Sequence, residues 1–232
     1  MHILITRPIE DCLKLIESLK ILGHQVTHFP LIKIKQLSYK EPNYKNYNGI
    51  IFTSSNAIDC LDIKKIPKNI FCFCVGHATE KKAKSKGFYQ AISAGGNVDM
   101  LTELIMRTYD KKSGKLLYIS SEFISKELDK DLASNGYLVD RIINYTSLPI
   151  EEISENTLSF IKQNKPDAIF VYSEKSAINL KNLITKYSLV DVMMDSKLLC
   201  ISKKTSKVLE FLKWKKIVIF NPGDEIFNLN RV

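Results

Sequence analysis

Short apolar runs alternate along the chain with longer stretches in which apolar residues recur at three- and four-residue intervals. The short runs predict strands, and the longer stretches predict amphipathic helices. One clear helix covers residues 12–22, and Gly23 follows it as a stop. Ten strands are predicted, at His2–Thr6, Gln25–Phe29, Ile50–Thr53, Ile70–Val75, Tyr89–Ile92, Lys115–Ile119, Leu138–Ile143, Ala168–Tyr172, Leu198–Ile201 and Lys216–Phe220.

The alternation of strands and helices predicts an α/β fold in which helices cover both faces of parallel sheets. An internal repeat divides the ten strands between two sheets. The segment Ile50–Ala57 reappears as Ala168–Ala177, and each is an apolar strand that leads through a hydroxyl-rich turn into a helix. Phe71–Thr79 and Leu198–Thr205 form a second matching pair. Two similar domains with five strands each are therefore expected.

The length and composition agree with two compact domains. The chain has 232 residues, of which 45% are hydrophobic and 25% are charged, as in ordinary globular proteins. The connections between the domains are predicted at Lys33–Asn48, which is polar and rich in tyrosine, and at Tyr145–Glu152. No apolar run approaches the roughly 20 residues that would span a bilayer, so no contact with a membrane is expected.

The cysteines and the N-terminus predict the compartment. The number of cysteines is odd and none forms a C-x-x-C pair, which argues against a disulfide framework and against a zinc site. The first residues also lack the basic region and long apolar segment of a secretory signal. We therefore expect a cytoplasmic protein with buried thiols. The cysteines are Cys12, Cys60, Cys72, Cys74 and Cys200.

A formal net charge of +9 raises the question of nucleic-acid binding. Only four of the 34 basic residues are arginines, and arginine is the residue preferred for bidentate contacts with phosphates and guanine. The lysines are scattered, and the chain has no long basic tail. The charge therefore indicates a lysine-rich surface, with a polyanionic small substrate as the alternative, and no nucleic-acid partner is expected.

Hydroxyl-rich turns follow four of the predicted strands. Ligands of parallel α/β sheets bind at the carboxyl ends of the strands, where free helix amides and the helix dipole attract anions. One such turn alone is an ordinary capped helix, but four matched turns in two domains favour a shared cleft for a multiply anionic ligand. The candidate residues in these turns are Thr53, Ser54, Asn56, Gly76, Thr79, Ser173, Ser176, Ser202 and Thr205.

Motifs for other chemistry are missing from the sequence. It contains no G-x-G-x-x-G, no phosphate-binding G-x-x-x-x-G-K-[ST] and no G-x-S-x-G. His24 and His28 lie on a predicted turn and strand, where they are too far apart for a shared metal ion. Cys72 and Cys74 alternate along a predicted buried strand and are expected in the core. The sequence therefore predicts no metal, and nucleophilic catalysis has no support in it.

Several short motifs follow one another in a recognisable order. They are Ile3-Leu4-Ile5-Thr6-Arg7-Pro8, Phe52-Thr53-Ser54-x-Asn56-Ala57, Val75-Gly76-x-x-Thr79, Leu117-Tyr118-Ile119-Ser120-Ser121 and Asn144-Tyr145. Their order and spacing resemble those of uroporphyrinogen-III synthases over about the first 150 residues, and more loosely to about residue 212.

The resemblance implies two flavodoxin-like domains with parallel five-stranded sheets, facing each other across a cleft. One domain is inserted into the other, which places residues 1–35 and 149–232 in an outer domain and residues 36–148 in an inserted domain. The implied activity is that of a lyase in tetrapyrrole (haem) biosynthesis. It removes water from linear hydroxymethylbilane, which carries eight carboxylates, and closes the ring to uroporphyrinogen III with inversion of ring D. The family implies no metal or organic cofactor, and we expect a monomer.

The resemblance also assigns roles to residues. Tyr145 matches the family tyrosine whose phenol could act on the departing hydroxyl as an acid or as an orienting group. Thr79, Ser54, Ser173, Thr205 and Lys197 match positions that line the family's cleft, and Arg7 and Ser120 are expected among the substrate-binding residues. This sequence departs from the family pattern in three places, which are Tyr172 in place of threonine, Ser202 in place of glycine, and the tail after Trp214.

Two other functions remain open from the sequence. One is a non-catalytic two-domain protein that binds a polyanionic small ligand, which the missing signal segment and Tyr145 disfavour. The other is a protein associated with nucleic acid, which the small number of arginines disfavours.

Overall fold

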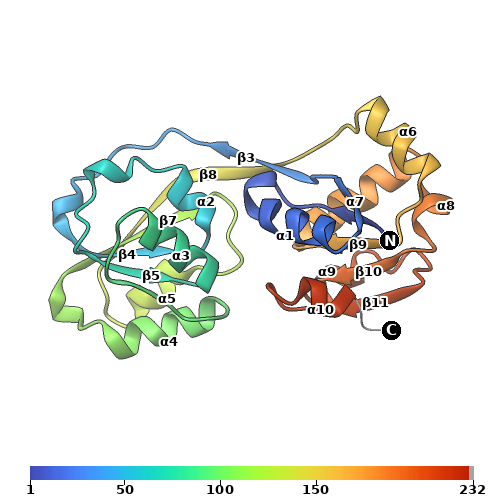
Figure 1. Cartoon of the computed structure of the whole chain (residues 1–232). Coiled ribbons are helices and arrows are strands. Elements are labelled where there is room, and N and C mark those ends of the chain that lie inside the picture. Colours follow the sequence, from blue (N-terminus) through green and yellow to red (C-terminus); the bar gives the residue numbers. More distant parts are fainter. Residues whose placement is uncertain (230–232) are drawn as a thin grey trace. The chain divides into compact units, whose positions relative to one another are not determined.

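The computed structural model describes residues 1–229, and the chain divides into two compact units (Figure 1). The outer unit consists of Met1–Lys33 together with the chain from Leu148 onward, and the inserted unit is Ile34–Ser147. These divisions fall within two residues of the predicted domain boundaries. No helix among residues 1–229 is long and apolar enough to cross a membrane.

The outer unit is a five-stranded sheet with helices, in the strand order β11-β10-β9-β1-β2. All four pairs of neighbouring strands are parallel. Numbered along this unit, the order is 2-1-3-4-5, which is the flavodoxin-like arrangement. Its elements are β1 (His2–Ile5), α1 (Ile9–Ile21), β2 (Gln25–His28), α6 (Glu155–Gln163), β9 (Ala168–Val171), α7 (Glu174–Lys186), α8 (Val190–Met193), β10 (Lys197–Cys200), α9 (Lys203–Lys207), β11 (Lys216–Ile219) and α10 (Glu225–Leu229).

The inserted unit has a six-stranded sheet in the order β3-β8-β7-β4-β5-β6. The strands β4 to β8 pair in parallel, and numbered along the chain they have the order 3-2-1-4-5, the other common doubly wound arrangement. Its elements are β3 (Ile32–Gln36), η1 (Tyr44–Asn46), β4 (Tyr47–Phe52), α2 (Ser55–Asp59), η2 (Ile63–Lys65), β5 (Phe71–Cys74), α3 (His77–Ser85), β6 (Ala91–Ser93), α4 (Val98–Thr108), η3 (Lys111–Ser113), β7 (Lys115–Ser121), α5 (Leu128–Ser134) and β8 (Val139–Pro149).

The sixth strand corrects the prediction of five strands in each sheet. Both chain crossings between the units run through strands, β3 and β8, in segments that we predicted as connectors. In β3 the apolar Ile32 and Ile34 alternate with Lys33 and Lys35, which is the two-residue period of a half-buried edge strand. The lysines point outward and Ile34 packs against the core, so the polar composition of this segment concealed a strand.

Each sheet is buried on both faces. In the outer unit, Leu4 and Ile169 pack into one apolar cluster, while Ile3, Ile5 and Phe170 pack into the cluster on the other face. Side chains alternate between the faces of a strand, so a strand covered on both sides reads as a continuous apolar run. This is why these strands could be found from the sequence.

Asn179 on α7 holds the two ends of the chain crossings together in the outer unit. Its amide nitrogen donates to the carbonyl oxygens of Leu31, at 2.6 Å, and of Ile150, at 2.9 Å. The backbone of the same two residues is also paired, because the amide of Ile150 donates to the carbonyl of Leu31. Asn179 is buried, so its side chain is the hydrogen-bond partner of backbone groups that water cannot reach.

Replacing Asn179 with alanine is expected to lower the free energy of unfolding by about 2–3 kcal/mol, because buried carbonyls lose a partner. Chemical denaturation measures this loss. Asn135→Ala is the matched control, since that exposed side chain only bonds the carbonyl of Asp131 in its own helix. Equal stabilities of the two variants would show that Asn179 does not stabilise the crossings.

The five cysteines are buried free thiols, as predicted. The Sγ atoms of Cys72 and Cys74 lie 3.9 Å apart on one face of β5. Burial raises the pKa of the Cys12 thiol to about 11 and that of Cys200 to about 12. Both thiols therefore stay protonated in the folded protein at a pH where the unfolded chain would begin to ionise.

We expect the free energy of unfolding to fall as the pH rises above about 9. A folded pKa above the unfolded value means that the unfolded state loses its proton first, so stability decreases by up to about 1.4 kcal/mol per pH unit for each thiol. Urea denaturation between pH 7 and pH 10.5 measures the slope. In a Cys200→Ala variant the slope should be smaller, and an unchanged slope would contradict the assignment.

Candidate functional site

Each unit has a topological switch point, where the order of its parallel strands reverses. In the outer unit this point lies between β1 and β9, and in the inserted unit it lies between β4 and β7. Ligands of open α/β sheets bind outside the carboxyl ends of the strands at such points. A ligand site is therefore expected at each of these two switch points.

A β-bulge sets the position of Tyr145. Along β7 and β8, Ser120 pairs with Ile143 but the next residue, Ser121, pairs with Tyr145, so Asn144 is the extra residue. The Asn144 amide donates to the carbonyl of Ala57 in α2, at 2.7 Å, on the face where Tyr145 packs. Two consecutive side chains can face the same side of a sheet only where a bulge interrupts the alternation. The bulge thus turns Tyr145 toward the end of β4.

The phenol of Tyr145 lies among hydroxyl groups. The side chain is 7% exposed, and the nearby side chains of Ser54 and Ser121 influence its hydroxyl. Burial raises the pKa of Tyr145, and the two serine hydroxyls oppose the shift without cancelling it. The group is therefore a neutral phenol at physiological pH, able to donate one hydrogen bond.

Two further hydroxyl groups meet on the other face of this sheet. Thr53 Oγ1 and the Tyr118 hydroxyl are 3.2 Å apart, and Tyr118 packs in the apolar cluster opposite to that of Tyr145. We did not single out Tyr118 or Ser121 as site residues from the sequence. Both belong to the motif Leu117–Ser121, and the alternation along β7 puts Ser121 on the face of Tyr145 and Ser120 on the face of Tyr118.

The position of Ser120 corrects its assignment to substrate binding. Its side chain is fully buried, its hydroxyl donates to the carbonyl of Ser121, and it accepts from Arg141 Nε at 2.8 Å. The Arg141 guanidinium also donates to the carbonyl of Ser121 and lies 5.9 Å from the centre of the Tyr118 ring. Ser120 thus helps to hold Arg141 and presents no group to a ligand.

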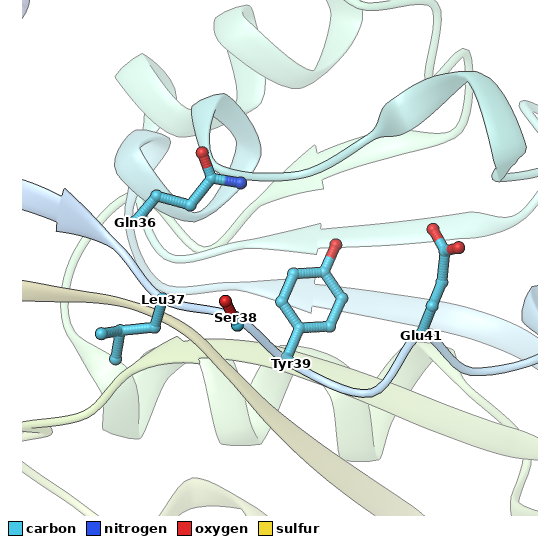
Figure 2. A pocket seen from close by; sticks show the side chains of 5 residues that line it. All are labelled: Gln36, Leu37, Ser38, Tyr39 and Glu41. Atoms are coloured by element: carbon cyan, nitrogen blue, oxygen red, sulfur yellow. The ribbon is translucent and has the colours of Figure 1, made fainter.

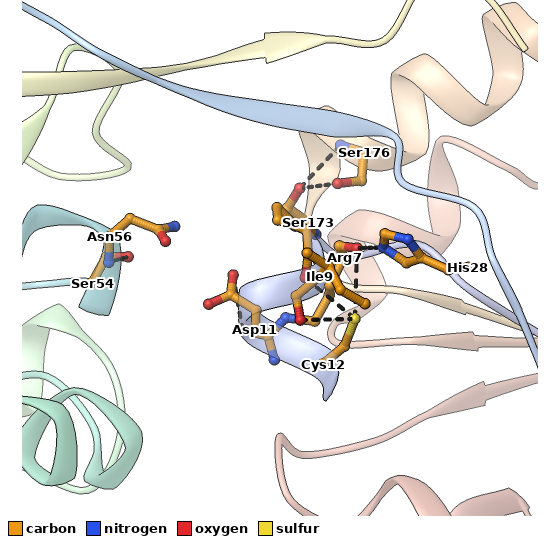
Figure 3. Close-up of polar contacts among 10 residues, drawn as sticks. Arg7, Ile9, Asp11, Cys12, His28, Ser54, Asn56, Ser173 and Ser176 are labelled. Atoms are coloured by element: carbon orange, nitrogen blue, oxygen red, sulfur yellow. Dashed lines mark hydrogen bonds and ion pairs between the residues drawn. The ribbon is translucent and has the colours of Figure 1, made fainter. Parts of the chain in front are cut away.

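Four helices begin at the predicted hydroxyl-rich turns. Ser54, Gly76, Ser173 and Ser202 are the N-cap residues of α2, α3, α7 and α9. The three serine hydroxyls each accept a hydrogen bond from an amide of their own helix, at 3.0–3.2 Å. Figure 3 shows the side chains of Ser54 and Ser173 at two of these turns. The turns are therefore N-caps first, which leaves mainly backbone amides for an anion.

The third helical residue completes three of these turns. Thr79, Ser176 and Thr205 are all buried, in α3, α7 and α9 respectively. The hydroxyl of Ser176 lies 2.8 Å from that of Ser173, and the hydroxyl of Thr205 lies 3.0 Å from that of Ser202.

The helices that begin at the four turns differ in length. The helices α2 and α9 have only five residues, whereas α3 has nine and α7 has 13. The dipole of a helix acts through its terminal amides, and one continuous helix aligns more of them. Of the two predicted turns in the outer unit, the one at Ser173 and Ser176 is thus the stronger anion-binding candidate.

Serine at position 202 does not change the backbone of its turn. Glycine at this position could adopt a positive φ that serine disfavours, but Gly76 has φ −142° and Ser202 has φ −158°. Both angles are extended and open to any residue. A Cβ atom on Gly76 would also meet nothing within 4 Å, so the two positions are equivalent.

Arg7 lies at the switch point of the outer unit. It follows β1, and its guanidinium is 3.6 Å from the Asp11 carboxylate and 4.8 Å from the centre of the Tyr172 ring. The carbonyl of Arg7 is bonded to His28 Nε2, at 2.8 Å (Figure 3). The side chain is 31% exposed, so part of the guanidinium can still meet an anion.

Lys197 lies at the amino ends of the strands, whereas the hydroxyl-rich turns lie at their carboxyl ends. This position corrects its predicted role. It is the first residue of β10 and pairs with Lys216 and Ala168, the first residues of their strands. Its ammonium group donates to the carbonyl of Leu229, at 2.9 Å. Burial, together with the nearby Lys216 and Lys215, lowers its pKa. The turns lie at the carboxyl ends of the strands, so Lys197 does not belong to that site.

A separate hollow of about 510 Å³ lies along the segment after β3 (Figure 2). It is lined by Gln36, Leu37, Ser38, Tyr39 and Glu41. None of the predicted site residues lines it, and its charged group is a carboxylate, which disfavours an anionic ligand. Among residues 1–229, no group of three or more His, Cys, Asp or Glu side chains could hold a metal ion.

Comparisons with known proteins identify one family. Residues 14–221 match the family model of uroporphyrinogen-III synthase HemD. The chain is 25% identical over 240 residues to the porphyrin biosynthesis protein HemD of Ruminiclostridium josui. That match covers 93% of this chain but only 45% of the relative, so the chain spans about half of that protein's length.

Solved structures show the same fold. A uroporphyrinogen-III synthetase from Helicobacter pylori 26695 is similar with a TM-score of 0.61 at 15% identity, over 93% of this chain and 91% of the other. A mutant uroporphyrinogen III synthase from the extremely thermophilic bacterium Thermus thermophilus has a TM-score of 0.55 at 14% identity, over 98% and 96% of the two chains. At these identities the similarity concerns the fold, and the two parallel sheets agree with it.

Proposed function

The chain belongs to the uroporphyrinogen-III synthase family, a family of enzymes of porphyrin biosynthesis, and we propose that it catalyses the reaction of that family. Its substrate would be hydroxymethylbilane, and its product uroporphyrinogen III. The reaction removes the terminal hydroxyl as water, inverts ring D and closes the macrocycle, which makes the enzyme a lyase. The observation that carries the proposal is the buried neutral phenol of Tyr145 near Ser54 and Ser121, which lie at the ends of the two switch-point strands β4 and β7.

Tyr145 is proposed to assist the departure of the hydroxyl group. A protonated phenol among serine hydroxyls can donate a hydrogen bond to a leaving oxygen, and Ser54 and Ser121 would orient it. The electron-rich pyrrole expels the hydroxyl by itself once the oxygen is so bonded. The remaining task of the protein is to hold the linear chain in a shape that favours ring closure with inversion, which is catalysis by positioning.

The carboxylates of the substrate would be bound by the switch points and helix starts. Free amides at the N-termini of α3 and α7 suit acetate and propionate groups, and Arg7 supplies a positive charge in the outer unit. Ser173, Ser176, Thr79, Asn56, Thr53, Ser202 and Thr205 remain proposed as residues of these turns. The net charge of +9 would help to attract a substrate with eight carboxylates.

Product analysis tests the proposal. The protein is added to freshly generated hydroxymethylbilane, the products are oxidised, and the porphyrin isomers are separated by chromatography. We expect the type III isomer to dominate, whereas the uncatalysed reaction gives type I. Exclusive formation of type I at the rate seen without protein would refute the proposed activity. If the substrate binds tightly under those conditions, the protein is a binding protein instead.

A further inference from the structure

The switch point of the outer unit holds a pair of side chains that the sequence alone did not connect. Arg7 follows β1, and Tyr172 follows the neighbouring strand β9. We propose that Tyr172 is a positioning residue that holds Arg7 as the carboxylate-binding group of the outer unit. The identity of the carboxylate as part of hydroxymethylbilane rests on the proposed function, but the positioning itself does not.

The register of the two strands brings the side chains to the same level. Ile5 pairs with Phe170, and Arg7 and Tyr172 each lie two residues beyond these partners. The Thr6 hydroxyl donates to the carbonyl of Phe170, at 2.5 Å, which fixes the two strand ends to each other. The guanidinium carbon of Arg7 consequently lies 4.8 Å from the centre of the Tyr172 ring, within the range of a cation–π contact.

The ring of Tyr172 is itself held by aromatic neighbours. It stacks on Phe170 at 6.2 Å and meets the edge of Phe220 at 5.3 Å. Phe220 follows β11 and is buried. The tail after Trp214, which matches no family motif that we could place, thus supplies one wall of this aromatic cluster. The position where the sequence departs from threonine is filled by a ring that this tail packs against.

The Tyr172 phenol that contacts the Arg7 guanidinium is neutral. Burial raises the pKa of Tyr172, and the buried Glu225 carboxylate on α10 raises it further. The ring therefore contacts Arg7 through its face and does not form an ion pair with it. A tyrosine in this place holds a cation without neutralising it.

Arg7 retains capacity for a ligand. A guanidinium has five N–H donors, and the carboxylate that pairs with Arg7 among residues 1–229, that of Asp11, lies at 3.6 Å, too far for a short bidentate bond. With Tyr172 against one face and 31% of the side chain exposed, the remaining edge is fixed in direction. Ser173, the N-cap of α7, directly follows Tyr172 in the chain, so a carboxylate bound by Arg7 would also lie beside that helix start.

Arginine side-chain NMR tests the positioning without reference to any reaction. The chain has only four arginines, so their Nε–Hε signals can be resolved and assigned. The ring current of Tyr172 should shift the Arg7 signal upfield in the parent protein. A Tyr172→Leu variant should lose this shift, and a Tyr172→Phe variant should keep it. The same Arg7 signal in the parent and in the Tyr172→Leu variant would overturn the contact.

A titration with tricarballylate, a small tricarboxylate, tests the binding role. We expect the Arg7 signal of the parent to move on titration, with an affinity about tenfold weaker in Tyr172→Leu and largely restored in Tyr172→Phe. Phe211→Leu is the control, because it removes a different ring, 5.2 Å from the Lys181 ammonium. It should leave the Arg7 titration unchanged. An Arg7 signal that ignores tricarballylate, or equal affinities in the parent and Tyr172→Leu, would refute the proposal.

The turnover assay links the site to the proposed function. In that assay Tyr172→Leu should raise KM about tenfold while kcat stays close to that of the parent, and Tyr172→Phe should restore KM. If the parent forms no type III isomer, the proposed function fails, and the NMR experiments still decide the role of Tyr172. If the parent is active but KM does not change in Tyr172→Leu, the proposal for Tyr172 fails alone. Urea denaturation shows whether each variant is folded.

Discussion

Replacing Tyr145 with phenylalanine is expected to reduce turnover by about 100-fold or more, the usual contribution of one positioned acid group. The variant loses only the hydroxyl near Ser54 and Ser121, and the ring keeps its place in the apolar cluster. The free energy of unfolding should therefore change by no more than about 1 kcal/mol. Steady-state kinetics and urea denaturation of the same preparation measure both quantities.

Tyr109→Phe is the matched control for this experiment. Tyr109 is also a buried tyrosine of the inserted unit, and its hydroxyl donates to the carbonyl of Gly114, at 3.2 Å. It should lose a similar amount of stability and keep its turnover. If the parent is active and the Tyr145→Phe variant retains as much activity as the Tyr109→Phe variant, Tyr145 has no catalytic role.

The second large effect is expected from the turn at the start of α7. Replacing both Ser173 and Ser176 with alanine should raise KM by about tenfold or more, because hydrogen bonds to charged groups contribute about 1.5–3 kcal/mol. The hydroxyl oxygens of Ser173 and Ser176 lie 2.8 Å apart, so one hydroxyl donates a hydrogen bond to the other. The proton of the second hydroxyl remains for a hydrogen bond to an anion. Since this contact would be equally strong in the ground and transition states, kcat should change little. Steady-state kinetics separates the two parameters.

The cap itself must be distinguished from the ligand contact. The double variant also loses an N-cap, which costs about 1 kcal/mol of stability. Ser154→Ala loses the same kind of cap on α6, where the serine hydroxyl accepts from the amide of Thr157 and lies 2.8 Å from its hydroxyl. A rise in KM for the Ser154 variant as large as that of the double variant would show that the effect is structural.

The helix starts of the candidate site could be predicted from the sequence because capping is local. A hydroxyl residue between an apolar strand and an amphipathic stretch caps the helix through bonds within four residues. Ser54, Ser173 and Ser202 all do so. The continuous apolar runs of the buried strands are equally local signals. The turns and most of the strands therefore lie where the sequence predicts them.

The direction of side chains at strand ends depends on pairing between distant segments. Ser120 and Ser121 are chemically identical, and only the phase of β7 decides that Ser121 faces Tyr145 while Ser120 bonds Arg141. The bulge at Asn144 is likewise a property of the pair β7 and β8. The motif alone could not separate the two serines, because both belong to it.

Whether a residue lies at the amino ends or the carboxyl ends of the strands also depends on the fold. Lys197 belongs to the predicted strand region, but its place at the amino end of β10 excludes it from the site at the carboxyl ends. The contact of Arg7 with Tyr172 joins residues 165 positions apart and follows only from the pairing of β1 with β9. No local pattern in the sequence carries that information.

The isomer ratio under multiple turnover tests whether the protein catalyses ring closure with inversion. Hydroxymethylbilane is supplied in large molar excess over the protein, and the amounts of type I and type III product are followed with time. We expect type III to form in amounts far above the amount of protein, and the Tyr145→Phe variant to restore the type I product. Product that is type I throughout, or type III limited to one equivalent of protein, would contradict this expectation.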